Sequence, residues 1–186
     1  MKEKLRKIYH NSTLATKIRY SYLLLLIPIV AFLIFCFCNL WSSNRKYEDM
    51  LNSAMVASEF SLDFKKDYDY ETYLLIVENK TLDESKLGEM LKEANRIVDG
   101  LEELTDSKEN RNRLASAKKY LNNLQIYKER IEQNLKDGNK YENNIEIWEN
   151  DVQIVTALMR ETIFQYIYYE IKDIQKARTE YQDFFM

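Results

Sequence analysis

The sequence predicts an all-α protein, in which an N-terminal transmembrane helix continues into an extracytoplasmic antiparallel four-helix bundle. Three observations lead to this prediction. One apolar run lies near the N-terminus, apolar residues recur at steps of 3 and 4 through the rest of the chain, and no segment alternates with period 2 as a strand would. Only three glycines and one proline interrupt the 186 residues. We therefore expect long helices with short connections.

The apolar run covers residues 20–44. Arg19 and Arg45 bracket these 25 residues, none of which is charged. As a helix the run reaches about 37 Å, enough to cross a hydrocarbon core of about 30 Å. Pro28 removes one backbone hydrogen bond, a defect that membrane helices tolerate. The run is thus predicted to be a membrane anchor in contact with the lipid bilayer.

Basic residues indicate the orientation of this anchor. Six lysines and arginines precede the run against one acid, whereas only Arg45 and Lys46 follow it closely. Because lysine and arginine stay on the cytoplasmic side, residues 1–19 are predicted to be a cytoplasmic basic leader and residues 45–186 to lie outside the plasma membrane. A cleaved signal peptide fits less well. The apolar region of a signal peptide is shorter than this run and ends at a cleavage site of small residues, whereas bulky residues surround Cys36 and Cys38 here.

The first external segment is expected to extend the anchor helix. Apolar residues recur from Tyr47 to Phe64, polar residues at Lys65–Asp69 suggest a turn, and a short helical stripe follows up to Val77. Thr81 and Glu84 have the spacing of a capping box, which predicts that the next helix begins there and runs to Leu104.

The third helical segment has a heptad seam. Its N-cap is expected within Thr105–Ser107, and Gly138 is placed to end it in the left-handed conformation. The seam consists of Leu114, Ala117, Leu121, Leu124, Lys128, Ile131 and Leu135.

The last helix is expected from Tyr141–Asn144 to the end of the chain. Its predicted inner face comprises Ile145, Trp148, Val152, Val155, Met159, Ile163, Tyr166, Glu170, Ile174, Ala177, Tyr181 and Phe184. Lys128 and Glu170 interrupt apolar seams. They are places where strain or a choice of helix register could arise, although a snorkelling or exposed position is the more ordinary expectation. In an up-down-up-down bundle this helix returns toward the membrane, so a second span is expected beyond Met186.

Few residues qualify for chemistry, and we predict no catalytic, cofactor-binding or metal-binding residue. The glycines are too scattered for a phosphate-binding loop, His10 is the only histidine, and Cys36 and Cys38 both lie in the apolar run. Residues 45–186 hold 21 basic against 29 acidic side chains, a formal charge near −8, which argues against a nucleic-acid partner. The carboxylates have the spacing of solvated helix surfaces.

Tyrosine is unusually frequent, with 14 residues. Two groups could line a ligand pocket, because aromatic rings combine apolar area with a polar group. The ordinary alternative is packing in the bundle core. The groups are Tyr166, Tyr168 and Tyr169, and Tyr68, Tyr70 and Tyr73.

The chain resembles the N-terminal part of YesM-like bacterial sensor histidine kinases of two-component systems. The resemblance is carried by the basic leader, by Ser21–Pro28 and by Tyr166–Glu170, together with Ser58–Phe64 and Ser107–Arg111. It implies a homodimeric sensor domain at 45–186 that detects an extracellular ligand or a binding protein. In that family a second span, a histidine-bearing domain and an ATP-binding domain follow, and a longer parent would address a cytoplasmic response regulator. None is present here, so these residues are not expected to be an enzyme.

The expected function is therefore that of a membrane-anchored extracytoplasmic sensor module, which passes a stimulus inward by helix displacement. Two alternatives remain open. One is the ligand-binding bundle of a chemoreceptor, and the other is a complete single-pass structural coiled-coil protein of the cell envelope.

Overall fold

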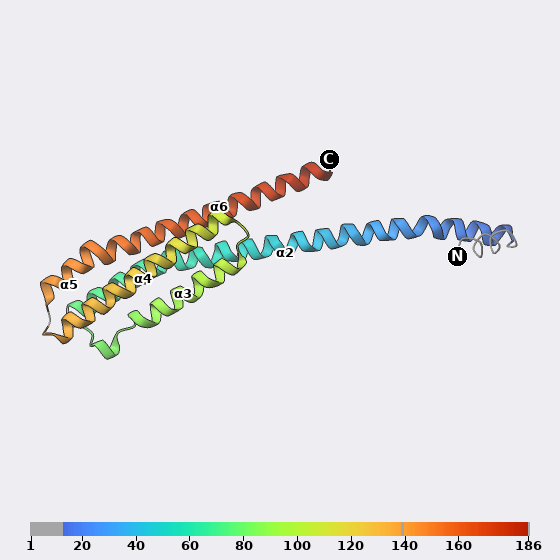
Figure 1. Ribbon diagram of the computed structural model, residues 1–186. Helices are drawn as coiled ribbons and strands as arrows, with labels where there is room; N and C mark the ends of the chain where they lie inside the picture. The colour runs from blue at the N-terminus through green and yellow to red at the C-terminus, as the bar shows by residue number, and fades with distance from the viewer. Residues whose placement is uncertain (1–12, 139, 186) are drawn as a thin grey trace. The chain divides into compact units, whose positions relative to one another are not determined.

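The computed structural model describes residues 13–138 and 140–185, and all regular structure in them is helical (Figure 1). The prediction of an all-α protein is confirmed. The elements are α2 (Leu14–Ile76), the 3₁₀ turn η1 (Leu82–Glu84), α3 (Leu87–Leu104), α4 (Lys108–Lys136), α5 (Tyr141–Ile147), the π-helical turn η2 (Trp148–Val152) and α6 (Gln153–Phe185).

The chain divides into two compact units, Met1–Lys46 and Tyr47–Met186, and α2 contributes to both. In the first unit, α2 is long and apolar enough to cross a membrane, judged by length and composition. Pro28 lies inside this helix without ending it, and the large apolar side chains around it are exposed. His10 and most of the basic leader lie outside the described residues.

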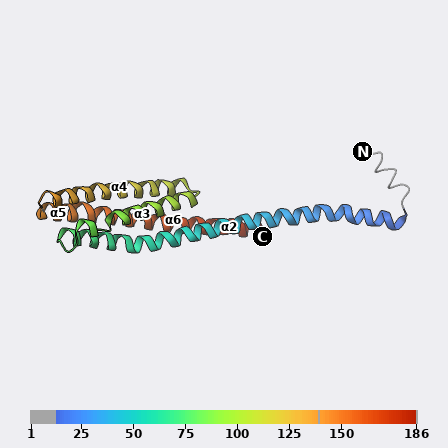
Figure 2. The same ribbon diagram turned by 90° about the horizontal axis from the view of Figure 1, so that it is seen from below.

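The second unit is an antiparallel bundle of four helical segments (Figures 1 and 2). Within it, α4 packs closely against both α6 and α3. The part of α2 that follows Lys46 joins the same core through large side chains, and it lies beside α6, where Asp69 Oδ1 accepts a hydrogen bond of 2.8 Å from Thr156 Oγ1.

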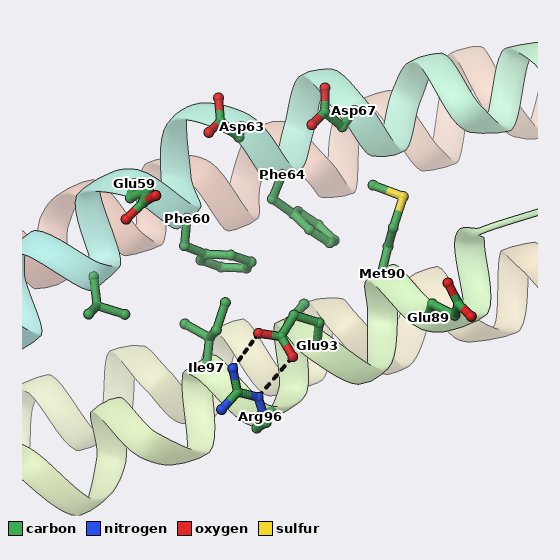
Figure 3. Close-up of a pocket in the computed structure, with 12 residues that line it drawn as sticks. Glu59, Phe60, Asp63, Phe64, Asp67, Glu89, Met90, Glu93, Arg96 and Ile97 are labelled. Carbon is green, nitrogen blue, oxygen red and sulfur yellow. Dashed lines mark hydrogen bonds and ion pairs between the residues drawn. The ribbon is translucent and has the colours of Figure 1, made fainter.

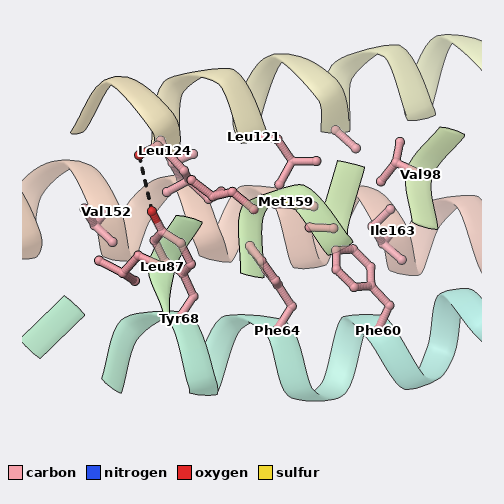
Figure 4. Close-up of a cluster of buried hydrophobic side chains, with 14 of the residues drawn as sticks. Phe60, Phe64, Tyr68, Leu87, Val98, Leu121, Leu124, Val152, Met159 and Ile163 are labelled. Atoms are coloured by element: carbon pink, nitrogen blue, oxygen red, sulfur yellow. Dashed lines mark hydrogen bonds between the residues drawn. The ribbon is translucent and has the colours of Figure 1, made fainter. Parts of the chain in front are cut away.

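The core of the bundle is one continuous apolar cluster (Figure 4). From α2, Phe60, Phe64 and Tyr68 pack in a row, the first pair tilted and the second stacked, with ring centroids 5.1 and 5.3 Å apart. The Tyr68 hydroxyl reaches across the core and donates to the Leu124 carbonyl at 3.3 Å. Each fully buried leucine or isoleucine stabilises the fold by about 1.5–3 kcal/mol. The bundle is therefore held mainly by burial.

The heptad seam of α4 is confirmed. Leu114, Ala117, Leu121, Leu124 and Ile131 are buried, and Leu135 is partly buried. Lys128 lies half-buried, and its Nζ pairs with Glu132 at 2.8 Å. Both predicted ends are also correct. Ser107 is the N-cap, with its Oγ accepting from Asn110 N at 3.4 Å, and Gly138 follows the helix with φ +104°.

The turn predicted at Lys65–Asp69 is absent, because α2 continues without a break to Ile76. The charged residues stabilise the helix instead of ending it. Lys65 and Asp69 form an ion pair across one turn, and both contact Thr156 of α6. High polarity without glycine or proline is thus compatible with a helix interior.

The helix predicted to begin at Thr81 begins at Leu87. Glu84 accepts hydrogen bonds from Thr81 N and Thr81 Oγ1 at 3.0 and 2.9 Å, but this pairing encloses only the 3₁₀ turn. The first free amide of α3 is satisfied from elsewhere, because Glu71 Oε1 accepts from Lys86 N at 2.9 Å. A carboxylate at this end of a helix also complements its dipole.

The predicted inner face of the last helix needs a correction at its start. Asn144 and Ile147 are buried, whereas Ile145 and Trp148 are only partly buried. The π-helical turn explains the change, because it holds one residue more than an α-turn and so rotates the residues that precede it relative to those that follow. From Val152 to Tyr166 the predicted face is buried as expected. The side chains of Ala177, Tyr181 and Phe184 lie outside the described part.

Candidate functional site

An open groove of about 570 Å³ runs between α2 and α3 within the second unit (Figure 3). Its α2 wall begins at Val56 and ends at Asp67, and its α3 wall begins at Glu89 and ends at Ile97. In Figure 3 the side chains of Phe60, Phe64, Met90 and Ile97 point into the space between the helices. The floor of the groove is therefore apolar.

The sequence produces this groove by placing unequal side chains on the two helices. On α2, Phe60 and Phe64 are four residues apart, and their rings pack against each other with tilted planes. On α3, Ala94 presents only a methyl group between Met90 and Ile97. The phenylalanine rings fill the space next to the core. Because the side chain of Ala94 is small, the space between the two helices farther from the core stays open.

The rims of the groove are acidic. Glu59, Asp63 and Asp67 follow the outer edge of α2, where Asp63 and Asp67 point away from α3 in Figure 3, and Glu89 and Glu93 belong to α3. Arg96 is the one basic residue of the lining, and its Nη2 pairs with Glu93 Oε1 at 2.5 Å. Hydrogen bonds from Arg96 lower the pKa of Glu93 below its ordinary value. The groove thus combines an apolar floor with an excess of negative charge.

A buried polar cluster lies at the end of the bundle where α3 meets α4. The Glu170 carboxylate is only 2% exposed, and it accepts a hydrogen bond of 2.9 Å from Asn110 Nδ2 and another from Thr105 Oγ1. Asn110 Oδ1 accepts in turn from Arg113 Nη1 at 2.8 Å, and the Arg113 guanidinium lies over the Tyr169 ring at 3.8 Å. The prediction that Glu170 is exposed or snorkelling is wrong.

Tyr166 lies next to this cluster. Its hydroxyl is buried close to Ser53, Thr105 and Glu170, but it makes no hydrogen bond of ordinary geometry among the described residues. Burial, together with the negative charge of Glu170 nearby, raises the pKa of Tyr166 to about 12. Burial also raises the pKa of Tyr68, and the charges of Glu132 and Asp69 add to the effect. Both phenols are therefore structural, neutral groups.

The two predicted tyrosine groups do not form a pocket. Tyr166 and Tyr68 are in the core, as the packing alternative expected, whereas Tyr70 and Tyr168 are each 62% exposed. Tyr73 packs against Trp148 with tilted ring planes and centroids 5.2 Å apart, and Tyr168 meets Tyr169 edge to face at 5.2 Å. No tyrosine lines the groove.

A second hollow of about 610 Å³ lies between α4, α5 and the π-helical turn. Its lining is mainly polar and includes the amides of Gln133, Asn134, Asn143 and Asn150. Arg130 and Asp151, which also line it, approach each other to 4.0 Å. It lacks the continuous apolar floor of the groove.

Comparison with known proteins identifies no relative: no protein-family model, curated protein or solved structure matches this chain. Within the described residues, no group of three or more histidine, cysteine, aspartate or glutamate side chains could hold a metal ion. The groove is accordingly the best candidate for a functional site.

Sequence reasoning missed the groove because it treated carboxylates on helices as solvated surface. A signal was nevertheless present. Glu59, Asp63 and Asp67 recur every four residues, each directly beside the aromatic seam of Phe60 and Phe64 or one turn beyond it. Such a row marks the border of the buried face, where a partner can contact charged and apolar groups together.

Proposed function

We propose that this chain is the membrane-anchored sensor module of a two-component sensor histidine kinase, with residues 45–186 outside the plasma membrane. The observation that carries the proposal is the open groove between α2 and α3. It provides a binding surface on the helix that also contains the apolar run. The kinase part rests on the resemblance of the sequence and would belong to a longer parent. No enzymatic activity is proposed for residues 1–186.

Occupancy of the groove would act on α2. A ligand between α2 and α3 contacts Phe60 and Phe64, whose rings are part of the bundle core. Because packed cores switch between discrete arrangements instead of deforming smoothly, such a contact favours one position of α2 over another. A small displacement of α2 is the signal that the proposal requires.

We propose a second copy of the chain as the partner for an exposed apolar stripe on α2. Leu51, Met55 and Leu62 are 65%, 63% and 62% exposed. Their spacing of 4 and 7 residues places them on one stripe of the helix. Contiguous apolar surface of this kind commonly marks a protein contact.

We expect the stripe to continue onto α6. Lys65 and Asp69 of α2 both contact Thr156, and the two helices are antiparallel, so Met55 lies level with residues 166–170. Phe164, Tyr168 and Ile171 are exposed around this level. We call these three residues, together with Leu51, Met55 and Leu62, the apolar face. Pairing of two apolar faces would bring α2 and α6 of both copies together.

Cysteine crosslinking in membranes tests this pairing. In a background with Cys36 and Cys38 replaced by alanine, Met55→Cys and Leu62→Cys should give disulfide-linked dimers. Asp63→Cys is the matched control, since neighbouring side chains on a helix point about 100° apart. Monomers at all positions, or equal dimer yields at Leu62 and Asp63, would count against a homodimer through this face.

The orientation is tested separately. Asn123 is exposed on α4, so Asn123→Cys in the same background should react with a membrane-impermeant maleimide in intact cells. Labelling only after the membrane is permeabilised would place the bundle in the cytoplasm and refute the sensor proposal.

A further inference from the structure

We propose that the groove between α2 and α3 binds a cationic amphipathic peptide helix. This inference rests on the proposed function, because it names the ligand of a bundle that is proposed to face the outside. It is carried by the shape of the groove and by the spacing of the charges along its rims.

The groove has the length of a short helix. From Val56 to Asp67 its α2 wall extends for about 16 Å, which corresponds to about three helical turns. Phe60, Phe64 and Met90 provide an apolar floor along this length. An amphipathic helix binds such a groove by laying its apolar face on the floor.

The rim charges select for a cationic ligand. Glu59, Asp63 and Asp67 are four residues apart, so their successive positions on the helix are separated by a rise of about 6 Å. These three side chains make no ion pair within the described part of the chain, whereas Arg96 is already paired with Glu93. Lysines at every fourth position of a peptide helix would repeat the same 6 Å interval of about one turn.

A single metal ion does not fit this arrangement. In the described part of the chain, no group of three or more histidine, cysteine, aspartate or glutamate side chains is arranged to hold a metal ion, so the rim carboxylates are not gathered around one cation. A peptide helix with lysines spaced along it matches the row of rim carboxylates better than a single compact cation does.

The groove and the apolar face occupy different sides of α2. Asp63 directly follows Leu62, so the two side chains point about 100° apart. A peptide in the groove therefore leaves Leu51, Met55 and Leu62 available for a second copy. Peptide binding and pairing of two chains are compatible.

The test uses the full-length protein in nanodiscs of phosphatidylcholine and a fluorescently labelled probe. The probe is an amidated 18-residue peptide of leucine and lysine, with all lysines on one helical face. A scrambled peptide of equal composition and a version with glutamate in place of lysine are the matched ligands. Binding is measured by fluorescence anisotropy, with empty nanodiscs subtracted.

The matched protein variants each remove three negative charges. The groove variant combines Glu59→Gln, Asp63→Asn and Asp67→Asn. The control variant combines Asp83→Asn, Glu103→Gln and Glu142→Gln, which are exposed positions outside the groove. Circular dichroism of both variants should show the same helix content as the wild type, which is the control for correct folding.

We expect the groove variant to bind the probe at least ten-fold more weakly and the control variant to bind as the wild type does. The scrambled and glutamate peptides should bind weakly to all three proteins. Equal loss in both variants, or no loss in the groove variant, would overturn the proposal. If spermidine displaced the labelled probe as well as an equal concentration of unlabelled peptide does, the proposal would also be overturned, and a small polycation would be the ligand. Since these outcomes do not depend on maleimide labelling of Asn123→Cys, a failure here is distinct from a failure of the sensor proposal.

Discussion

The Asn110 side chain of α4 donates a hydrogen bond of 2.9 Å to the Glu170 carboxylate of α6 inside the bundle. Both residues are buried, and the second donor to the carboxylate is the Thr105 hydroxyl. This contact joins the start of α4 and its preceding turn to the second half of α6. It replaces the apolar contact that a leucine seam would have made at the same level.

Removing the amide should destabilise the bundle. In Asn110→Ala the buried carboxylate keeps only Thr105 as a donor, so we expect a loss of about 1–3 kcal/mol in the free energy of unfolding. Asn123→Ala, at an exposed position of the same helix, should change it by less than about 0.5 kcal/mol. Denaturant titration of the full chain in detergent measures both, and equal effects would contradict a specific role for this contact.

Glu71 should make the stability depend on acidic pH. Burial of the carboxyl opposes ionisation, but hydrogen bonds from Lys80 Nζ at 2.6 Å and Lys86 N at 2.9 Å outweigh burial and lower its pKa below 4.5. The stabilisation is therefore present above about pH 4.5 and is lost as the pH falls through the lowered pKa.

Glu71→Gln should be less stable than the wild type at neutral pH and should lose less stability on acidification. Thermal unfolding followed by circular dichroism across this range measures the difference, with Glu103→Gln as the exposed control. A constant gap between wild type and Glu71→Gln at every pH would refute the assignment.

Tyr166 should produce the opposite dependence at alkaline pH. Its pKa is raised from 10.0 to about 12, so its contribution is complete below pH 10.0 and is lost as the pH rises through about 12. Tyr166→Phe removes a hydroxyl that lies near Ser53, Thr105 and Glu170 without a hydrogen bond of ordinary geometry in the described structure. We expect it to fold as stably as the wild type at neutral pH and to resist alkaline unfolding better. A large loss at neutral pH would show that the hydroxyl has a partner.

Two glycines should respond to alanine in opposite directions. A Cβ at Gly100, inside α3, would meet nothing within 4 Å, so Gly100→Ala should stabilise the protein by about 0.5–1 kcal/mol through helix propensity. Gly138 has φ +104°, and Gly138→Ala should cost about 1–2 kcal/mol. If the melting temperature rose in both variants, the prediction for Gly138 would be wrong, because the turn after α4 would then accept alanine without strain.

The helical class, the α4 seam and its two ends could be predicted because local rules determine them. Ser107 caps the helix through its own hydroxyl, and Gly138 adopts a conformation that other residues avoid. The start of α3 could not be found in this way, because its first amide is satisfied by Glu71, fifteen residues earlier. The charged segment at Lys65–Asp69 was misjudged for the same reason, since Thr156 contacts it from a distant part of the chain.

The candidate site was the least predictable part. The groove exists because α3 covers only one side of Phe60 and Phe64. Periodicity predicts which face of a helix is buried, but it does not predict which other helix packs against that face. The burial of Glu170 likewise follows from Asn110 and Thr105 on other segments. Orientation of the anchor and pairing of two chains stay predictions.

The π-helical turn determines where one residue could be deleted from the last helix without changing which side of the helix faces the core. Ile147 and Val152 are both buried although they are five residues apart, and the extra residue of the π-helical turn is what lets both halves of the helix face the core. Loss of one codon within residues 148–152 would restore an ordinary α-turn and keep both halves in register. Loss of one codon between residues 156 and 163 would instead turn one half by about 100° and expose its apolar side.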